Sequence, residues 1–216
     1  MVANPAAEST RGPYRNGVRR RELIRRQASE VFAERGYAGG SLRAIAARVD
    51  VSPASVIQHF GSKEGLLMAV LDDWEERTAR LTSTDRVGLD FFESLGDLMR
   101  FHVAHPGLLE LFLTLATEAT RDDHPANEFV HRRYDAIRLL WSTHLREAAQ
   151  LGQVGLSEAQ IDEEVRLLAA IADGLELQWL LDPQVDLVGL FQRYLRSAID
   201  RWTATRPALT DSRRTR

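Results

Sequence analysis

The 216-residue sequence contains no cysteine, and Lys63 is its only lysine. Without thiols the chain can form no disulfide, no thiolate nucleophile and no cysteine-ligated metal site. It also lacks the run of about 20 apolar residues that a membrane span requires, and its first residues show no secretory signal. We therefore expect a cytoplasmic protein that contacts no membrane and uses no metal or other cofactor.

Signals for β-strands are equally scarce. Strand-like alternation of apolar and polar residues is missing, and the one Asn-Gly dipeptide follows no strand-like segment. Apolar residues recur instead at helical spacing, and glycine, proline and aspartate mark the breaks. The sequence predicts an all-α fold of about nine helices, near 17–35, 42–49, 53–59, 63–81, 88–104, 106–121, 125–151, 158–181 and 186–204.

The net charge of −3 hides a strong asymmetry along the chain. Residues 1–63 carry 11 Lys and Arg against 5 Asp and Glu, whereas residues 64–216 carry 17 against 26. A basic amino-terminal part on an acidic body is the distribution expected when one end meets a polyanion. The charge pattern therefore favours a nucleic-acid partner, although a solvated basic surface would show the same excess.

Residues 41–60 have the pattern of a helix-turn-helix. Ser41 and Ser52 stand where helix N-caps are expected, and Pro53 follows at the first helical position, where its missing N–H costs nothing. The apolar residues expected to lock the two helices together are Leu42, Ile45, Ala46, Val49, Val56 and Phe60. A short second helix of this kind fits the DNA major groove.

At these residues the sequence resembles the TetR family of transcriptional regulators. The resemblance covers about residues 18–72 and rests on four groups at fixed spacing: Ala-Glu-Arg-Gly-Tyr at 33–37, Ser-Leu-Arg-Ala-Ile-Ala at 41–46, Val-Ser-Pro-Ala-Ser at 51–55, and His-Phe-Gly-Ser-Lys-Glu-Gly-Leu-Leu at 59–67. It implies a three-helix DNA-binding domain with a helix-turn-helix, followed by a larger helical domain that binds an effector and forms a homodimer.

The resemblance also implies roles for single residues. Ser41, Arg43, His59 and Lys63 stand where the family contacts the DNA backbone, and a cation beside free helix N–H groups makes a good phosphate seat. The full set of expected DNA-binding residues is Ser41, Arg43, Ser52, Pro53, Ala54, Ser55, Ile57, Gln58, His59 and Lys63. Arginines of the first helix, and Arg11 and Arg15 before it, are either further DNA contacts or solvated charges.

Three positions depart from the family pattern. Ile57 stands where the family usually has tyrosine, which removes one polar DNA contact. Ala54 replaces a commoner glycine or lysine, and Asp50 replaces a turn glycine, although aspartate tolerates the left-handed conformation fairly well. We expect the fold to be kept and the operator preference to differ from that of relatives.

We divide the chain into a flexible arm (1–16), a DNA-binding domain (17–81, helix-turn-helix 41–60), an effector and dimerisation domain (82–205) and a flexible tail (206–216). The aromatic and polar residues expected to line an effector cavity are Trp74, Met99, Phe101, His102, Phe112, Leu115, Trp141, His144, Leu145 and Gln178. Each of them could instead be an ordinary core residue.

Two amphipathic segments near the carboxyl end are the expected dimer interface, because two such helices and their symmetry mates can form a four-helix bundle. The residues concerned are Ile161, Val165, Leu168, Ala172, Leu175, Trp179, Phe191, Leu195, Ile199 and Trp202. A monomeric bundle core explains the same stripes. A dimer would place two recognition helices about one DNA turn apart, as a palindromic operator requires.

Three functions compete on this basis. The first is a repressor that a small apolar or aromatic ligand releases from a palindromic operator. The second is a helical ligand-binding protein with weakened DNA recognition. The third is an all-α enzyme, and because no nucleophile motif, phosphate loop or metal spacing organises the acid–base residues, we expect no enzymatic activity.

Overall fold

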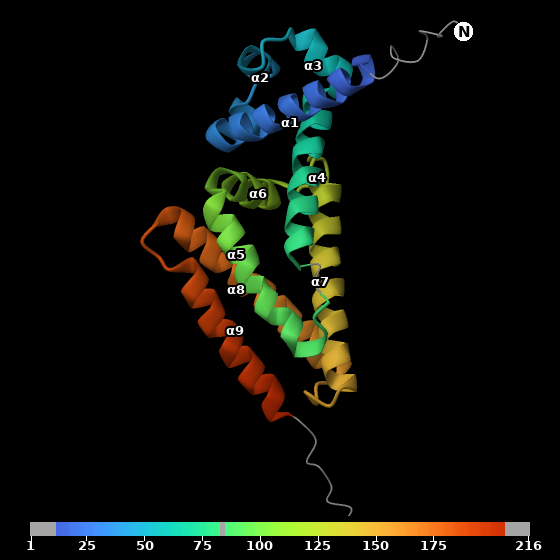
Figure 1. Ribbon diagram of the computed structural model, residues 1–216. Helices are drawn as coiled ribbons and strands as arrows, with labels where there is room; N and C mark the ends of the chain where they lie inside the picture. Colours follow the sequence, from blue (N-terminus) through green and yellow to red (C-terminus); the bar gives the residue numbers. More distant parts are fainter. Residues whose placement is uncertain (1–11, 83–84, 206–216) are drawn as a thin grey trace, which may run out of the picture. The chain divides into compact units, whose positions relative to one another are not determined.

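A computed structural model describes residues 12–82 and 85–205 and shows an all-α protein. Within those residues the chain forms nine α-helices and one 3-10 helix (Figure 1). Contacts divide it into two compact units, Met1–Trp74 and Glu75–Arg216. The predicted arm up to residue 11 and the predicted tail lie outside the described residues.

The first unit opens with a helix that is longer than the sequence predicted. Helix α1 (Gly12–Gly39) begins five residues before the expected start at Gly17. At Gly36 the backbone leaves the helical conformation (φ 67°, ψ 172°), in a region that is open almost only to glycine. Gly36 therefore breaks the helix as predicted, but one further turn follows it.

Three capped helices follow, namely α2 (Leu42–Arg48), α3 (Pro53–Phe60) and α4 (Lys63–Thr82), and α4 continues into the second unit. The Ser41 hydroxyl accepts a hydrogen bond from the Ala44 N–H at 3.2 Å. The Ser52 hydroxyl likewise accepts from the Ser55 N–H at 3.1 Å, and this confirms both predicted N-caps. Between the helices, Asp50 takes the left-handed conformation (φ 51°) that the turn requires.

The second unit contains η1 (Gly88–Ser94), α5 (Leu95–Ala104), α6 (Pro106–Glu118), α7 (Asn127–Gln150), α8 (Glu158–Leu181) and α9 (Leu187–Ala204). The predicted helix at 88–104 is thus two elements, of which the first is a 3-10 helix. The Phe91 carbonyl accepts from the Ser94 hydroxyl at 2.7 Å, while the Leu95 N–H bonds to Phe92 instead of Phe91. The serine therefore takes an acceptor that a continuous α-helix would use.

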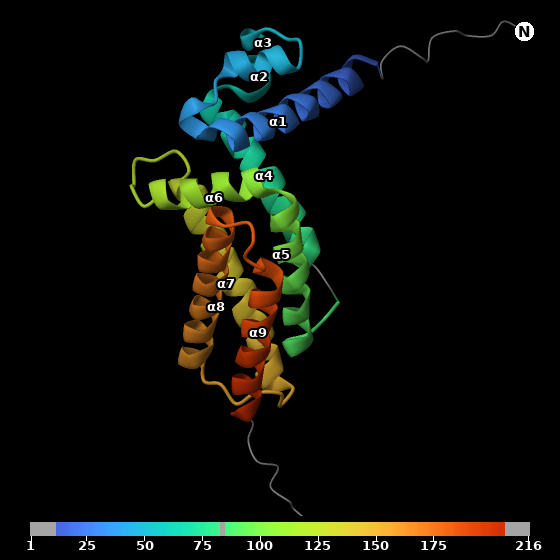
Figure 2. The same cartoon turned by 90° about the vertical axis from the view of Figure 1, so that its left-hand side faces the viewer.

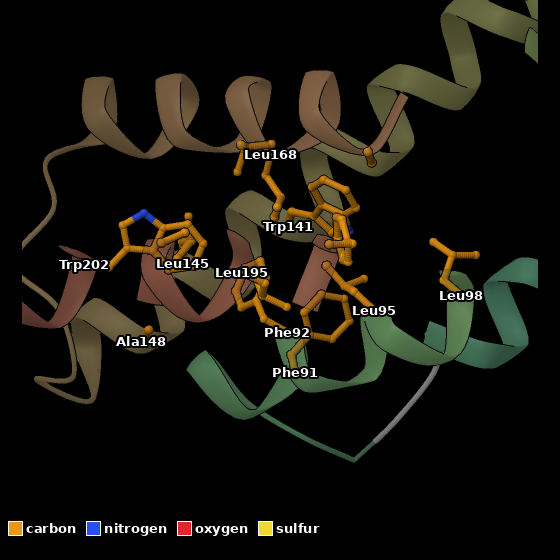
Figure 3. Close-up of a cluster of buried hydrophobic side chains, with 14 of the residues drawn as sticks. Phe91, Phe92, Leu95, Leu98, Trp141, Leu145, Ala148, Leu168, Leu195 and Trp202 are labelled. Atoms are coloured by element: carbon orange, nitrogen blue, oxygen red, sulfur yellow. The ribbon is translucent and has the colours of Figure 1, made fainter. Parts of the chain in front are cut away.

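Helices α5, α7, α8 and α9 pack around one apolar core in this unit (Figures 1 and 2). Figure 3 shows Phe91 and Phe92 of η1 meeting Trp141 and Leu145 of α7 and Trp202 of α9. The Phe92 and Trp202 rings lie 5.2 Å apart, edge to face. No helix in the described part of the chain is both long and apolar enough to cross a membrane.

Candidate DNA-binding site

The helix-turn-helix is held in shape by a small apolar core. Ile45 of α2 and Val56 of α3 are fully buried, and Phe60 is nearly so. They pack with the apolar side of α1, where Ile24 and Phe32 are also fully buried. Burial of one side of each short helix leaves the opposite side for contacts outside the molecule.

The predicted DNA-binding residues lie on the outer side of α2 and α3 and at the start of α4. Seven of them are exposed, namely Ser41, Arg43, Ser52, Pro53, Ala54, Ile57 and Gln58, and three are half-buried, namely Ser55, His59 and Lys63. Ile57 exposes 47% of its surface, which is unusual for a large apolar residue. The structure therefore presents polar groups and one apolar side chain along α3.

Lys63 is held in place by neighbours that sequence reasoning did not single out. Its ammonium donates to the Ala38 carbonyl at 3.4 Å and lies 4.4 Å from the centre of the Tyr37 ring. The Tyr37 hydroxyl donates to the Glu64 carboxylate at 3.0 Å, and partial burial together with that carboxylate raises the pKa of Tyr37 to about 12. Tyr37 and Glu64 thus position the cation at the start of α4.

Arg21 of α1 supports the far end of α3. Its guanidinium donates to the His59 carbonyl and lies 4.3 Å from the centre of the Phe60 ring. A helix leaves its last carbonyls without intrahelical partners, and a cation there also complements the helix dipole. Arg21 therefore fixes the end of α3. In the sequence alone, Arg21 could not be distinguished from the other arginines of the first helix.

We expect Arg21→Ala to weaken DNA binding roughly three- to tenfold, because the loss of one charged hydrogen bond and one cation–π contact loosens α3. The salt dependence of binding should stay unchanged, because no phosphate contact is removed. Fluorescence anisotropy across a salt series measures both quantities. Arg196→Ala, at an exposed arginine of α9, is the control. A reduced salt slope for Arg21→Ala would instead assign Arg21 to a phosphate.

The residues predicted to line an effector cavity are spread over both units. Trp74 lies in the first unit, Gln178 is exposed, and most of the others are buried in the second unit. His102 donates from Nδ1 to Glu176 at 2.6 Å, and the ring of His144 stacks on that of Phe91 with centres 3.8 Å apart. These ten residues therefore stay a prediction, with contacts typical of a core.

A hollow of about 590 Å³ lies elsewhere in the second unit, between α6, α7 and α8. None of the ten predicted residues lines it. Its walls consist of Ala116, Ala119, Thr120, Val130, His131, Tyr134, Asp135, Arg138, Arg166, Ala169, Ala170 and Asp173. Sequence reasoning missed this site because its polar residues are spread over two helices and its apolar ones are mostly alanine.

Most of the residues assigned to a dimer interface lie in the core of the single chain, which contradicts the assignment for the buried ones. Seven of the ten residues are buried in the core, namely Ile161, Val165, Leu168, Ala172, Phe191, Leu195 and Trp202, and the other three pack against it. A side chain that is already buried within one chain cannot contact a second copy. The structure thus supports the alternative of a bundle core for these seven residues. Leu175, Trp179 and Ile199 are half-buried, and their dimer contact stays a prediction.

The described residues contain no group of three or more His, Asp or Glu placed to hold a metal ion. His102 and His105 lie three residues apart, a spacing at which two histidines can share a metal ion, but His102 pairs with Glu176. His105 donates from Nδ1 to the Phe101 carbonyl at 2.8 Å, and its Nε2 lies 3.0 Å from an Arg77 nitrogen. Both rings are therefore engaged with protein groups.

Residues 24–70 match the family described as "Bacterial regulatory proteins, tetR family". The HTH-type transcriptional repressor Rv3405c of Mycobacterium tuberculosis is 28% identical over 184 residues, which cover 84% of this chain and 82% of that protein. The HTH-type transcriptional repressor AcnR of Corynebacterium diphtheriae is 27% identical over 158 residues, covering 72% of this chain and 78% of that protein.

Solved structures show the same fold. A TetR transcriptional regulator from Chloroflexus aurantiacus superposes with a TM-score of 0.74 at 23% identity, covering 87% of this chain and 97% of that one. SmeT, the repressor of the Stenotrophomonas maltophilia multidrug efflux pump SmeDEF, superposes with a TM-score of 0.66 at 21% identity, covering 84% and 89%. With its matching motifs and capped helix-turn-helix, the segment 24–70 is a TetR-family DNA-binding domain, and the chain has the fold of TetR-family transcriptional regulators.

Proposed function

We propose that the protein is a repressor that binds a palindromic operator as a homodimer and leaves it when a small molecule binds the second unit. The observation that carries this proposal is the exposed face of α3. The opposite face of the helix packs in a buried core, and Arg21 bonds to its last turn. Ser41 and Arg43 of α2 and Lys63 of α4 would contact phosphates on either side of the groove.

Base recognition is assigned to α3. Ser52, Ser55 and Gln58 offer hydrogen-bond donors and acceptors, whereas Ile57 offers only apolar surface. Apolar side chains recognise the methyl group of thymine in the major groove. We assign Ile57 that contact, which would compensate for the polar contact that relatives obtain from tyrosine.

The surface assigned to the homodimer is the outer face of α8. Leu167, Leu177 and Leu181 expose 46%, 51% and 79% of their surface. Ile171 and Gly174 lie between them at helical spacing, and a side chain at Gly174 would meet open space. This second apolar face lies opposite the buried one, so it can pair with a second copy without disturbing the core.

Selection of bound sequences from random double-stranded DNA tests the proposal. We expect an inverted repeat whose half-sites lie about one helical turn apart. On that site Arg43→Ala should bind about tenfold more weakly, with a salt slope reduced by about one, because one phosphate contact is lost. Arg196→Ala, at an exposed arginine of α9, is the control. Enrichment of no sequence would contradict the proposal.

The exposed Ile57 also supports a second candidate, a ligand-binding protein with weakened DNA recognition. The same selection, carried out in parallel with an Ile57→Tyr variant, separates the two. Enrichment by the native chain favours the repressor. Enrichment by the variant alone favours the second candidate, because the restored hydroxyl would then be the missing contact.

A further inference from the structure

The hollow between α6, α7 and α8 has the size and composition of a small-molecule site. Its volume of about 590 Å³ falls within the range of roughly 300–1,000 Å³ found for ligand pockets. Figure 2 shows α7 and α8 alongside each other in the second unit, with α6 lying across one end of them. Ala116 and Ala119 of α6, Val130 of α7, and Ala169 and Ala170 of α8 give it an apolar lining.

The two arginines of the hollow are already paired with carboxylates. Arg138 Nη1 lies 3.2 Å from Asp135 Oδ1, and its Nε lies 3.9 Å from Asp162 Oδ1. Arg166 Nε lies 2.9 Å from Asp162 Oδ2. Two cations and two anions thus balance at this end of the hollow, which gives an anionic ligand little net attraction.

The carboxylate of Asp173 lacks such a balance. It accepts a hydrogen bond from the Tyr134 hydroxyl at 2.7 Å, and no ion pair joins it to an arginine or lysine of the described residues. Burial, with a further contribution from the nearby Glu176, raises the pKa of Asp173 to about 6. Glu176 is itself buried and is already paired with His102 at 2.6 Å. A cation in the hollow would therefore supply the missing counter-charge.

The end of α6 adds to this negative potential. The helix ends at Glu118, and Ala116, Ala119 and Thr120 of this end line the hollow. The carboxyl end of a helix carries partial negative charge, which is reduced here because the Thr117, Glu118 and Ala119 carbonyls accept hydrogen bonds from Thr120, Arg121 and Asn127. Asp173 and the end of α6 are thus two independent sources of negative potential along one apolar wall.

We propose that this hollow binds a protonated amine with an apolar body, with its ammonium against Asp173 and its apolar part over the alanine lining. In a repressor of the kind proposed above, this ligand would be the effector. That role rests on the proposed function, whereas binding to the hollow does not, because it involves the second unit alone.

Three probes of matched shape test the charge requirement: 4-phenylbutylamine, 4-phenylbutanol and 4-phenylbutyrate. Isothermal titration calorimetry of the full chain without DNA, at pH 7.5, measures their affinities. We expect the amine to bind at least about tenfold more tightly than the alcohol, and the acid most weakly, because only the amine pairs with an ionised carboxylate. Equal affinities, preference for the acid, or no saturable binding of the amine would overturn the proposal.

Variants locate the site. Asp173→Asn should abolish the preference for the amine over the alcohol while leaving the affinity for the alcohol within about twofold. Asp97→Asn, at an exposed aspartate of α5 that pairs with Arg100 outside the hollow, should keep the preference. Circular dichroism establishes that both variants fold. A preference that survives Asp173→Asn would overturn the assignment.

Operator release is measured separately. Release of the selected operator by the amine, and its loss in Asp173→Asn, would support both proposals. Binding of the amine without release would leave the site standing and contradict its role as effector site. If the amine released the operator equally well from Asp173→Asn, the hollow would not be the effector site. Ligand-controlled repression would then stand, with the effector bound elsewhere.

Discussion

A protein carrying both Leu167→Glu and Leu177→Glu is expected to be monomeric and to bind operator DNA at least about 100-fold more weakly than the native chain. Two carboxylates on the outer face of α8 would be buried without partners in a dimer, which is strongly unfavourable. A monomer holds a single recognition helix, and the loss of a linked second half-site typically costs 10²- to 10⁴-fold in affinity. Analytical ultracentrifugation and fluorescence anisotropy measure the two effects.

The chain offers a matched control for this prediction. Leu139 and Leu151 lie outside α8 and expose 66% and 58% of their surface, much like the substituted leucines. Leu139→Glu with Leu151→Glu adds the same charge and should leave assembly and DNA binding unchanged. A native chain that is monomeric at micromolar concentration, or a charged α8 variant that remains dimeric, would show that this face is not the interface.

Asp173→Asn is expected to raise the free energy of unfolding at pH 7 by about 2–3 kcal/mol. The pKa of Asp173 lies near 6 in the folded protein, against an ordinary value of 3.8, and each unit of difference corresponds to about 1.4 kcal/mol. Asparagine removes the cost of a buried charge, and its side-chain oxygen can still accept the Tyr134 hydroxyl. Urea denaturation at fixed protein concentration measures the change.

The sign of this effect depends on pH. Between about pH 4 and 6 the folded chain keeps a proton on Asp173 that the unfolded chain has lost. The contribution of Asp173 to stability is therefore fully present below pH 4 and is lost as the pH rises through 6. Native and variant proteins should be equally stable near pH 4 and differ most above pH 7.

The control for Asp173→Asn is Asp135→Asn, at an exposed aspartate paired with Arg138. Exposed ion pairs contribute less than about 1 kcal/mol, so this variant should change stability little at any pH. If Asp173→Asn were destabilising at pH 7, or if the gain did not shrink on acidification, the carboxylate would not carry the buried charge described here.

The amino-terminal unit could be predicted closely because its signals are local. A serine cap depends on a hydrogen bond between residues three apart, and such bonds are present at Ser41 and Ser52. The turn at Asp50 and the break at Gly36 are likewise backbone preferences of single residues. These features, with motif residues at fixed spacing, led from the sequence to a helix-turn-helix.

The carboxyl-terminal unit was predicted less well because helical periodicity does not say what covers an apolar face. The buried stripe of α8, through Val165 and Leu168, was assigned to a dimer and lies in the core. The exposed face through Leu167 and Leu177 has the same period. Only the packing of α6, α7 and α9 against α8 distinguishes the two faces.

The sequence by itself determined the all-α class, most helix boundaries and the helix-turn-helix segment, because each follows from interactions within a few residues. Tertiary structure decided which side chains meet across long separations. Arg21 meets the carbonyl of His59, 38 residues away, and Tyr134 meets Asp173, 39 residues away. The first pair fixes the end of α3, and the second holds an uncompensated carboxylate in the hollow. No local pattern encodes either contact, because both depend on how helices pack.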